Sequence, residues 1–168
     1  MTVDQAFEQA LQYEMAIREQ YVEAARASIV AEARALYETL ATDEGYHVAY
    51  LDRQHAAWKR TGTTDAAEPQ RALPASSEVI AAITRTRASF SAIPEGGQMG
   101  ALQNALHAEE ATSAFYRSLA GQFPPDVSMV FARLLEIEDG HTAIVRAELD
   151  LFSGTGHWFD VRVFDMEE

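Results

Sequence analysis

The sequence has no cysteine among its 168 residues. Disulfides, thiolate metal sites, redox CxxC pairs and cysteine nucleophiles are therefore excluded together. Basic side chains are also scarce, since 13 lysines and arginines stand against 26 aspartates and glutamates, which gives a net charge of -13. Such a balance argues against nucleic acid or an anionic membrane as a partner.

Long apolar runs are missing as well. No stretch approaches the roughly 18 residues that a membrane span needs, and the beginning "MTVDQAFEQAL" lacks the basic-then-apolar pattern of a secretion signal. We therefore expect a cytoplasmic protein without a membrane partner. Hydrophobic residues make up 48% of the chain, which is enough for one domain with a core.

Hydrophobic spacing predicts five helices. Apolar residues recur every three or four positions over 3–27, where Thr2 and Gln5 can form a capping box at the start. Segments that contain glycine or proline separate four further helices, expected over about 31–60, 76–93, 98–121 and 126–152. Beyond them, the alternation of apolar and charged residues in "HWFDVRVFDMEE" predicts an extended tail.

Four of these helices are long and would form two hairpins, joined by a long crossover that contains the short helix. This order is typical of a four-helix bundle with one crossover. We therefore predict an all-α fold with a bundle domain over 1–153. The extended C-terminal tail over 154–168 is expected to dock on the bundle or on a partner subunit through His157 and Trp158.

The two hairpins are similar in sequence. "ALQYEMAIREQY" (10–21) aligns without gaps with "ALHAEEATSAFY" (105–116), at an offset of 95 positions. "EGYHVAYL" (44–51) aligns with "EDGHTAIV" (138–145), at an offset of 94 positions. Two related hairpins that face each other would make a bundle with an approximate twofold axis.

Each second helix of a hairpin carries one Glu-x-x-His unit: Glu44 with His47, and Glu138 with His141. Residues three apart share a helix face, because each residue turns the helix by about 100°. One such unit alone is weak evidence, because surface acids often stand beside surface histidines. The second copy strengthens the case.

Other acids and histidines are expected to lie outside any site. Glu136 and Asp139 point about 140° and 160° away from the histidine of their helix, so we interpret them as solvated. His55 has no counterpart in the second hairpin, which favours a structural or solvated role. His107 is expected at the surface.

Two further glutamates lie at matching heights. Glu14 and Glu109 stand as far from the turn of their hairpin as the glutamate of the paired helix does. Residues equidistant from a turn lie level on antiparallel helices, here about 20 Å from it. Facing hairpins would then bring four carboxylates and two imidazoles together. The predicted site consists of Glu14, Glu44, His47, Glu109, Glu138 and His141.

Four buried carboxylates would repel one another, and each unpaired charge would cost several kcal/mol. Two divalent cations would cancel their formal charge. Carboxylate and imidazole ligands without thiolate suit iron or manganese, and zinc can substitute. A glutamate on each of two helices, with Glu-x-x-His on each of the other two, is the ligand set of di-iron and di-manganese bundles. The alternative is a metal-free bundle that carries surface acids.

These motifs together resemble the ferritin-like superfamily, and most of all the rubrerythrin-type proteins. The resemblance covers 3–60 and 98–152, and it lies in "DEGYH", in "EDGH" and in a tyrosine seven residues after each lone glutamate. It implies a site for two iron ions per chain. Glu44 and Glu138 would bridge the ions, while Glu14 with the first histidine, and Glu109 with the second, would be terminal ligands.

Tyr21 and Tyr116 are the tyrosines that follow the lone glutamates. Two interpretations stay open for them, which do not exclude each other. One is packing in the core, and the other is a hydroxyl that orients a ligand carboxylate.

The sequence departs from rubrerythrin in two respects. Without cysteine it lacks the electron-transfer domain of rubrerythrin, so a separate electron donor would have to reduce the site. Thr112 stands where rubrerythrin has a further metal-site glutamate. The expected site is therefore closer to the arrangement of four glutamates and two histidines in bacterioferritin.

The resemblance implies a non-haem di-iron oxidoreductase that reduces hydrogen peroxide or dioxygen, with a role in oxidative stress. One alternative is a ferroxidase that handles iron. Another is a non-catalytic interaction bundle, which would bind no stoichiometric metal. We expect a homodimer, because the long crossover and the apolar tail are not features of a storage cage.

Overall fold

The computed structural model describes residues 1–65, 67–87, 99–119, 121–155 and 157–164. Within these ranges the chain forms α-helices, one short 3-10 helix and no strand. The elements are α1 (Val3–Ala27), α2 (Ala31–Thr61), α3 (Ser76–Arg87), α4 (Met99–Leu119), α5 (Pro125–Thr155) and η1 (Val161–Phe164). The predicted all-helical fold is confirmed. The expected continuation of the short helix over 88–93 lies outside the described residues.

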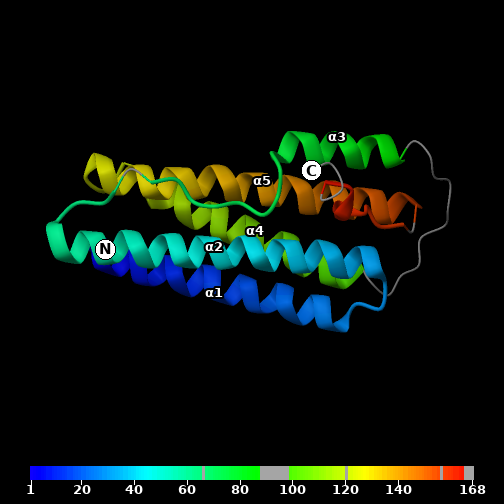
Figure 1. The fold of residues 1–168 in the computed structure, drawn as a ribbon, viewed down its shortest axis with the longest axis horizontal. Coiled ribbons are helices and arrows are strands. Elements are labelled where there is room, and N and C mark those ends of the chain that lie inside the picture. Colours follow the sequence, from blue (N-terminus) through cyan, green and yellow to red (C-terminus); the bar gives the residue numbers. More distant parts are fainter. Residues whose placement is uncertain (66, 88–98, 120, 156, 165–168) are drawn as a thin grey trace.

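The long helices lie side by side as a bundle (Figure 1). α1 packs along α2, and α4 packs along α5, so each predicted hairpin is present. Across the bundle α1 also contacts α4 and α2 contacts α5, while α3 lies outside, on α5. None of the described helices combines the length and the apolar character that crossing a membrane requires.

The helix boundaries follow from local sequence signals. Thr2 accepts a hydrogen bond from the N–H of Gln5, and its own N–H donates to the side chain of Gln5, which confirms the predicted capping box. α2 ends at Gly62, whose φ of 72° is the left-handed conformation that glycine adopts without strain. Pro125 occupies the first position of α5, where its missing N–H costs nothing. These ends set the heights of all residues along the hairpins.

Two hydrophobic clusters fill the bundle. One contains Tyr21, Leu40 and Val145, and the other contains Phe7, Leu51 and Leu134. On each long helix the two clusters are separated by about two to three turns, which carry the buried charged residues. The core is therefore apolar at both ends and polar at one level in between.

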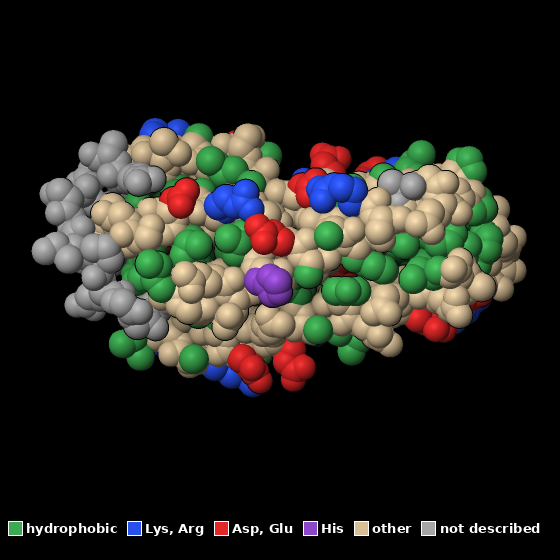
Figure 2. Space-filling model, turned by 180° about the vertical axis from the view of Figure 1, so that it is seen from behind, with side chains coloured by type: hydrophobic (Ala, Val, Ile, Leu, Met, Phe, Trp, Pro, Cys, Tyr) green, Lys and Arg blue, Asp and Glu red, His purple; other side chains and the backbone are tan. Residues whose placement is uncertain are grey.

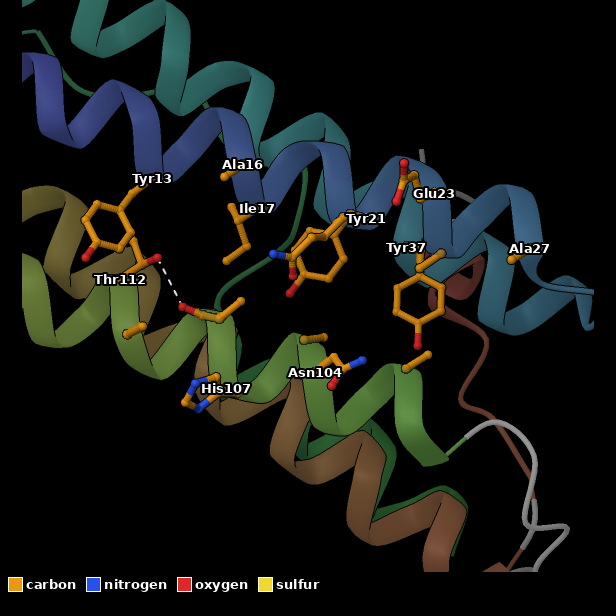
Figure 3. Close-up of a pocket in the computed structure, with 16 residues that line it drawn as sticks. Tyr13, Ala16, Ile17, Tyr21, Glu23, Ala27, Tyr37, Asn104, His107 and Thr112 are labelled. Atoms are coloured by element: carbon orange, nitrogen blue, oxygen red, sulfur yellow. Dashed lines mark hydrogen bonds between the residues drawn. The ribbon is translucent and has the colours of Figure 1, made fainter.

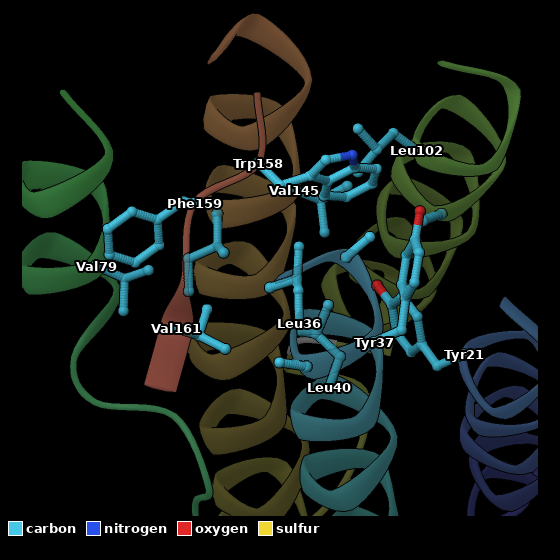
Figure 4. Close-up of a cluster of buried hydrophobic side chains, with 14 of the residues drawn as sticks. Tyr21, Leu36, Tyr37, Leu40, Val79, Leu102, Val145, Trp158, Phe159 and Val161 are labelled. Carbon is cyan, nitrogen blue, oxygen red and sulfur yellow. The ribbon is translucent and has the colours of Figure 1, made fainter. Parts of the chain in front are cut away.

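The C-terminal tail docks on its own bundle. Trp158, Phe159 and Val161 are buried in the first cluster, where Figure 4 shows them beside side chains of α2, α3 and α5. The Trp158 ring centre lies 5.7 Å from that of Tyr37 and 5.3 Å from that of Phe152. The aromatic residues of the tail thus extend the core beyond the four long helices.

The structure corrects two details of the predicted tail. α5 continues to Thr155 instead of ending at about 152, and Val161–Phe164 forms a 3-10 helix instead of an extended chain. The carboxylate of Asp160 accepts the N–H of Arg162 at 3.1 Å and pairs with its guanidinium. This local hydrogen bond favours a turn, whereas an extended chain would need a neighbouring strand to pair with its backbone.

A buried side chain fastens the chain that follows each hairpin. Gln54 Oε1 accepts the N–H of Asp65 at 2.9 Å, and Glu148 Oε1 accepts the N–H of Phe159 at 2.8 Å. The two acceptors are 94 positions apart, and so are the two donors. The internal repeat therefore extends past the helices, with glutamine in one half and glutamate in the other.

Replacing Glu148 with glutamine should change the pH dependence of stability. Burial raises the pKa of Glu148 from an ordinary 4.5 to about 8. Between these values the folded state binds more protons than the unfolded chain, so the free energy of unfolding falls as pH rises. We expect the free energy of unfolding of E148Q to equal that of the wild type near pH 4.5. Between that pH and about 8, it should exceed the wild-type value by on the order of 1 kcal/mol more for each pH unit. Urea unfolding at several pH values measures this, and parallel pH profiles would contradict it.

Candidate metal centre

All six predicted ligands lie at the polar level of the bundle. The side chains are contributed by every long helix, and none is more than 2% exposed. They are Glu14 from α1, Glu44 and His47 from α2, Glu109 from α4, and Glu138 and His141 from α5. The structure thus brings the six together, and their binding of a metal stays a prediction.

The six residues divide into two overlapping groups of four. In each group, one ligand atom per residue lies within 4.8 Å of the ligand atoms of the others. The first group is Glu14, Glu44, His47 and Glu138, and the second is Glu44, Glu109, Glu138 and His141. The shared members are the two glutamates expected to bridge. Each group adds one lone glutamate and one histidine, which is the predicted division.

The protein satisfies these buried groups only in part. Oε2 of Glu109 and Oε2 of Glu138 have no hydrogen-bond partner among the described residues. A buried polar atom without a partner costs about 1–3 kcal/mol. Two divalent cations would neutralise four carboxylates and coordinate the free oxygens, so the residues present fit a dinuclear metal site.

Crowding of charge shifts the proton affinities at the site. Burial, and then the Glu138 carboxylate, raise the pKa of Glu109. Burial also raises the pKa of Glu44, although His47 opposes it. For both histidines burial favours a lower pKa, but the carboxylates around them outweigh it and raise the pKa well above the ordinary value. Without cations the site therefore holds protons that metal binding would release.

Both imidazoles turn the same nitrogen toward the carboxylates. Nδ1 of His47 lies 3.1 Å from Glu44 Oε2 and 3.0 Å from Glu138 Oε1. Nδ1 of His141 lies 3.0 Å from Glu44 Oε1. The two rings are stacked, with centroids 5.4 Å apart. Nδ1 is therefore the atom through which each histidine could bind a metal at this level.

Asp43 is a further acidic residue beside the predicted ligands, and the sequence analysis did not identify it. It is buried, and its Oδ2 lies 2.9 Å from Nε2 of His141. Burial favours a higher pKa for Asp43, but other contacts outweigh it, above all the hydrogen bond to His141. The pKa of Asp43 is therefore lowered. An ionised Asp43 favours the proton on Nε2 and leaves Nδ1 free for a metal. The other carboxylate oxygen accepts the N–H of Ala72, which ties the crossover to the site.

The two histidines differ in this support. Ile137 stands at the position of the second hairpin equivalent to Asp43. Nε2 of His47 accordingly has no hydrogen-bond partner among the described residues. On its own helix Asp43 points about 100° away from Glu44. Only the rotation of α2 relative to α5 aims it at His141, and a pattern along one helix does not contain that rotation.

Each tyrosine holds the lone glutamate of the other hairpin. The Tyr21 hydroxyl donates to Glu109, and the Tyr116 hydroxyl donates to Glu14. Burial and the carboxylates raise the pKa of both phenols, so they stay protonated donors. Each ring also lies in a hydrophobic cluster. Packing in the core is therefore observed, and each hydroxyl bonds a predicted ligand across the two hairpins. That these hydroxyls orient metal ligands stays a prediction.

The residues expected outside the site do lie outside it. Nε2 of His55 is 2.9 Å from an oxygen of Asp4, so this histidine has a structural contact. His107 is exposed on α4, and Glu136 and Asp139 are exposed on α5.

A small pocket of about 240 Å³ lies beside Asp43 and His141, between α5 and the crossover. Arg71 and Ser76 contribute polar groups to its lining. Gly140 permits this close approach, since a Cβ there would lie 3.3 Å from Ser76. At about 30 Å³ for each water molecule, the pocket has room for several.

Comparison of the chain with models of protein families, with curated proteins and with solved structures found no match. The resemblance to rubrerythrin-type proteins rests on the motifs and stays a prediction.

Metal titration should show that the shared Glu138 contributes to metal binding and that the exposed Glu136 does not. We expect the wild type to bind about two Co²⁺ per chain, with a rise in melting temperature that grows with Co²⁺ concentration. Glu138→Gln removes a carboxylate common to both groups, so both ions should bind at least about tenfold more weakly. Glu136→Gln is the matched control and should bind like the wild type. Equal affinities in the two variants would contradict the assignment.

Replacing Asp43 should affect the two ions unequally. Asp43→Asn keeps the shape but removes the charge that fixes His141, so one of the two Co²⁺ ions should bind about 10–100-fold more weakly. The exposed Asp139→Asn serves as control. Calorimetric titration resolves the two steps. An equal loss at both steps, or at neither, would show that Asp43 does not support one histidine selectively.

Proposed function

We propose that this chain is a rubrerythrin-like di-iron protein of the ferritin-like superfamily that reduces hydrogen peroxide or dioxygen. The observation that carries the proposal is the division of six buried ligand residues into two groups that share Glu44 and Glu138. The all-helical bundle of two hairpins agrees with it. Oxygen and imidazole donors without thiolate favour iron, with manganese or zinc as competitors.

Two bound iron ions would supply the electron transfer to the small oxidant. The residues of the chain supply the arrangement. The shared glutamates would be ligands common to both ions and would balance part of their positive charge, while Tyr21 and Tyr116 would fix the direction of the terminal carboxylates through their hydroxyls. Asp43 fixes the tautomer of His141.

Access for a small polar molecule is available next to His141. The pocket there reaches Asp43 and His141 from the side of the crossover, and Glu136 lies in its lining. Reduction of hydrogen peroxide to two waters consumes two electrons and two protons, so the reaction needs a route for protons. The chain has no cysteine, so the electrons would come from a separate donor.

An iron-handling ferroxidase is the second candidate, and one observation favours it. Thr112 is buried one turn after Glu109, and its hydroxyl donates to the Ala108 carbonyl at 3.1 Å. No seventh ligand thus comes from this position, and a set of four glutamates and two histidines also suits oxidation of ferrous iron. Native mass bears on the choice, because storage needs a cage whereas we expect a homodimer.

The non-catalytic alternative relies on the tail as a surface for a partner. Trp158 and Phe159 are buried against the chain's own bundle. The tail is therefore part of the fold, which weakens this alternative.

Iron content and the visible spectrum test the proposal together. We expect about two iron ions per chain after growth with iron. Adding hydrogen peroxide to the anaerobic ferrous protein should produce ferric absorption and consume about one peroxide per pair of irons. Adding a reductant should then restore the spectrum of the ferrous protein. Accumulation of iron with each ferrous addition would instead support the ferroxidase. An iron content near zero per chain, in intact protein from cells grown with iron, would exclude both functions.

A further inference from the structure

The internal repeat is broken on the α1–α4 side of the bundle, and a groove lies at the break. It has a volume of about 680 Å³ and runs along α1 from Tyr13 to Ala27 (Figure 3). At 1.5 Å per residue this is a length of about 20 Å. Three alanines of α1 and four of α4 line it. Small side chains on both helices thus leave the space between them open.

The other half of the repeat fills the equivalent place. Leu119 stands at the position equivalent to Ala24, and Phe115 stands at the position equivalent to Gln20. Leu119 is buried in the second cluster, and Phe115 packs against that cluster. The fold therefore accepts large apolar residues at these two heights, where the half with the groove has alanine and glutamine instead.

Tyr37 brings an unused hydroxyl to the groove. The side chain is 1% exposed, and its hydroxyl has no hydrogen-bond partner among the described residues. In Figure 3 the hydroxyl points across the groove toward α4. Burial, and then Glu148, raise the pKa of Tyr37, so the group keeps its proton and can donate.

Packing does not require this hydroxyl. The ring of Tyr37 lies 6.0 Å from Tyr21, and the equivalent Phe131 lies 6.2 Å from Tyr116. Phenylalanine thus makes the same ring contact in the other half of the repeat. Because a buried hydroxyl without a partner costs about 1–3 kcal/mol, its presence on this side indicates a ligand that pairs with it.

The groove is almost free of charge. Glu23 is the one carboxylate in its described lining, which contains no lysine or arginine. On the face shown in Figure 2, which is turned away from the viewer in Figure 1, hydrophobic side chains lie among scattered charged side chains and a histidine. An anionic head group would therefore find no lysine or arginine in the described lining of the groove, whereas a neutral apolar molecule meets a matching surface.

We propose that the groove binds a neutral, elongated apolar molecule whose hydrogen-bonding oxygen pairs with the Tyr37 hydroxyl and whose hydrocarbon part lies along the alanines. Its volume falls within the roughly 300–1,000 Å³ of small-molecule sites. Tyr21 lines the groove while its hydroxyl holds Glu109, so the occupant lies against the wall of the metal centre. Binding does not depend on metal, and the inference therefore goes beyond the proposed function.

Calorimetric titration of the metal-free protein with 1-decanol tests this. We expect saturation at about one decanol per chain, since the Tyr37 hydroxyl can pair with one head group. Tyr37→Phe, which copies Phe131, should weaken binding about three- to tenfold without lowering the melting temperature of the free protein. Ala24→Leu, which copies Leu119, should abolish measurable binding. Tyr50→Phe on the same helix and the exposed Ala114→Leu are controls and should bind like the wild type.

Several results would overturn the inference. These are the absence of saturable binding, equal affinity in the wild type, Tyr37→Phe and Ala24→Leu, and decanoate binding as tightly as decanol. A dimer that Ala24→Leu converts to a monomer would show that a second copy occupies the groove, which also overturns it. Metal content separates this test from the proposed function. Two metals without decanol binding defeat only the groove, and decanol binding without metal defeats only the redox proposal.

Discussion

Four carboxylates buried at one level of a helix bundle are the constraint on which the rest of the structure depends. The chain offers them two imidazoles, two tyrosine hydroxyls and no cysteine. These partners orient the carboxylates but leave oxygens of Glu109 and Glu138 unpaired among the described residues. The hydrophobic clusters at both ends must therefore provide the stability that this level lacks. Such a level is costly as plain architecture, and two cations at the proposed site would offset this cost.

The internal repeat shows which features the centre requires and which distinguish its two sides. It holds for the ligand glutamates and histidines, for the tyrosines, and for the side chains that fasten the following segment. It breaks at Asp43, which supports one histidine only, and at Tyr37 and Ala24, which belong to the groove. A small polar pocket thus adjoins the centre near α5 and the crossover, and a large apolar groove adjoins it between α1 and α4. The predicted ligand set is thus approximately symmetric, whereas its surroundings are not.

Sequence could predict what repeats along one helix. The end of α2 at Gly62, the start of α5 at the prolines, the capping box at Thr2 and the height of Glu14 all follow from spacing and local signals. It could not predict contacts set by the rotation of one helix against another, such as Asp43 with the histidine of α5. The tail was predicted only in part for a related reason. Its alternating pattern predicts an extended strand, but the hydrogen bond from the Arg162 N–H to the Asp160 carboxylate favours a 3-10 turn instead.

The tail connects to the centre through packed aromatic rings. Glu148 holds the N–H of Phe159, which places Trp158 against Tyr37, and Tyr37 in turn lies against Tyr21. Tyr21 ends the series with its hydroxyl on a predicted ligand, Glu109. Glu148, Trp158, Tyr37 and Tyr21 thus form a continuous series of contacts from the tail to a carboxylate at the middle of the bundle. The buried Glu148 therefore belongs to the surroundings of the predicted site as well as to the anchoring of the tail.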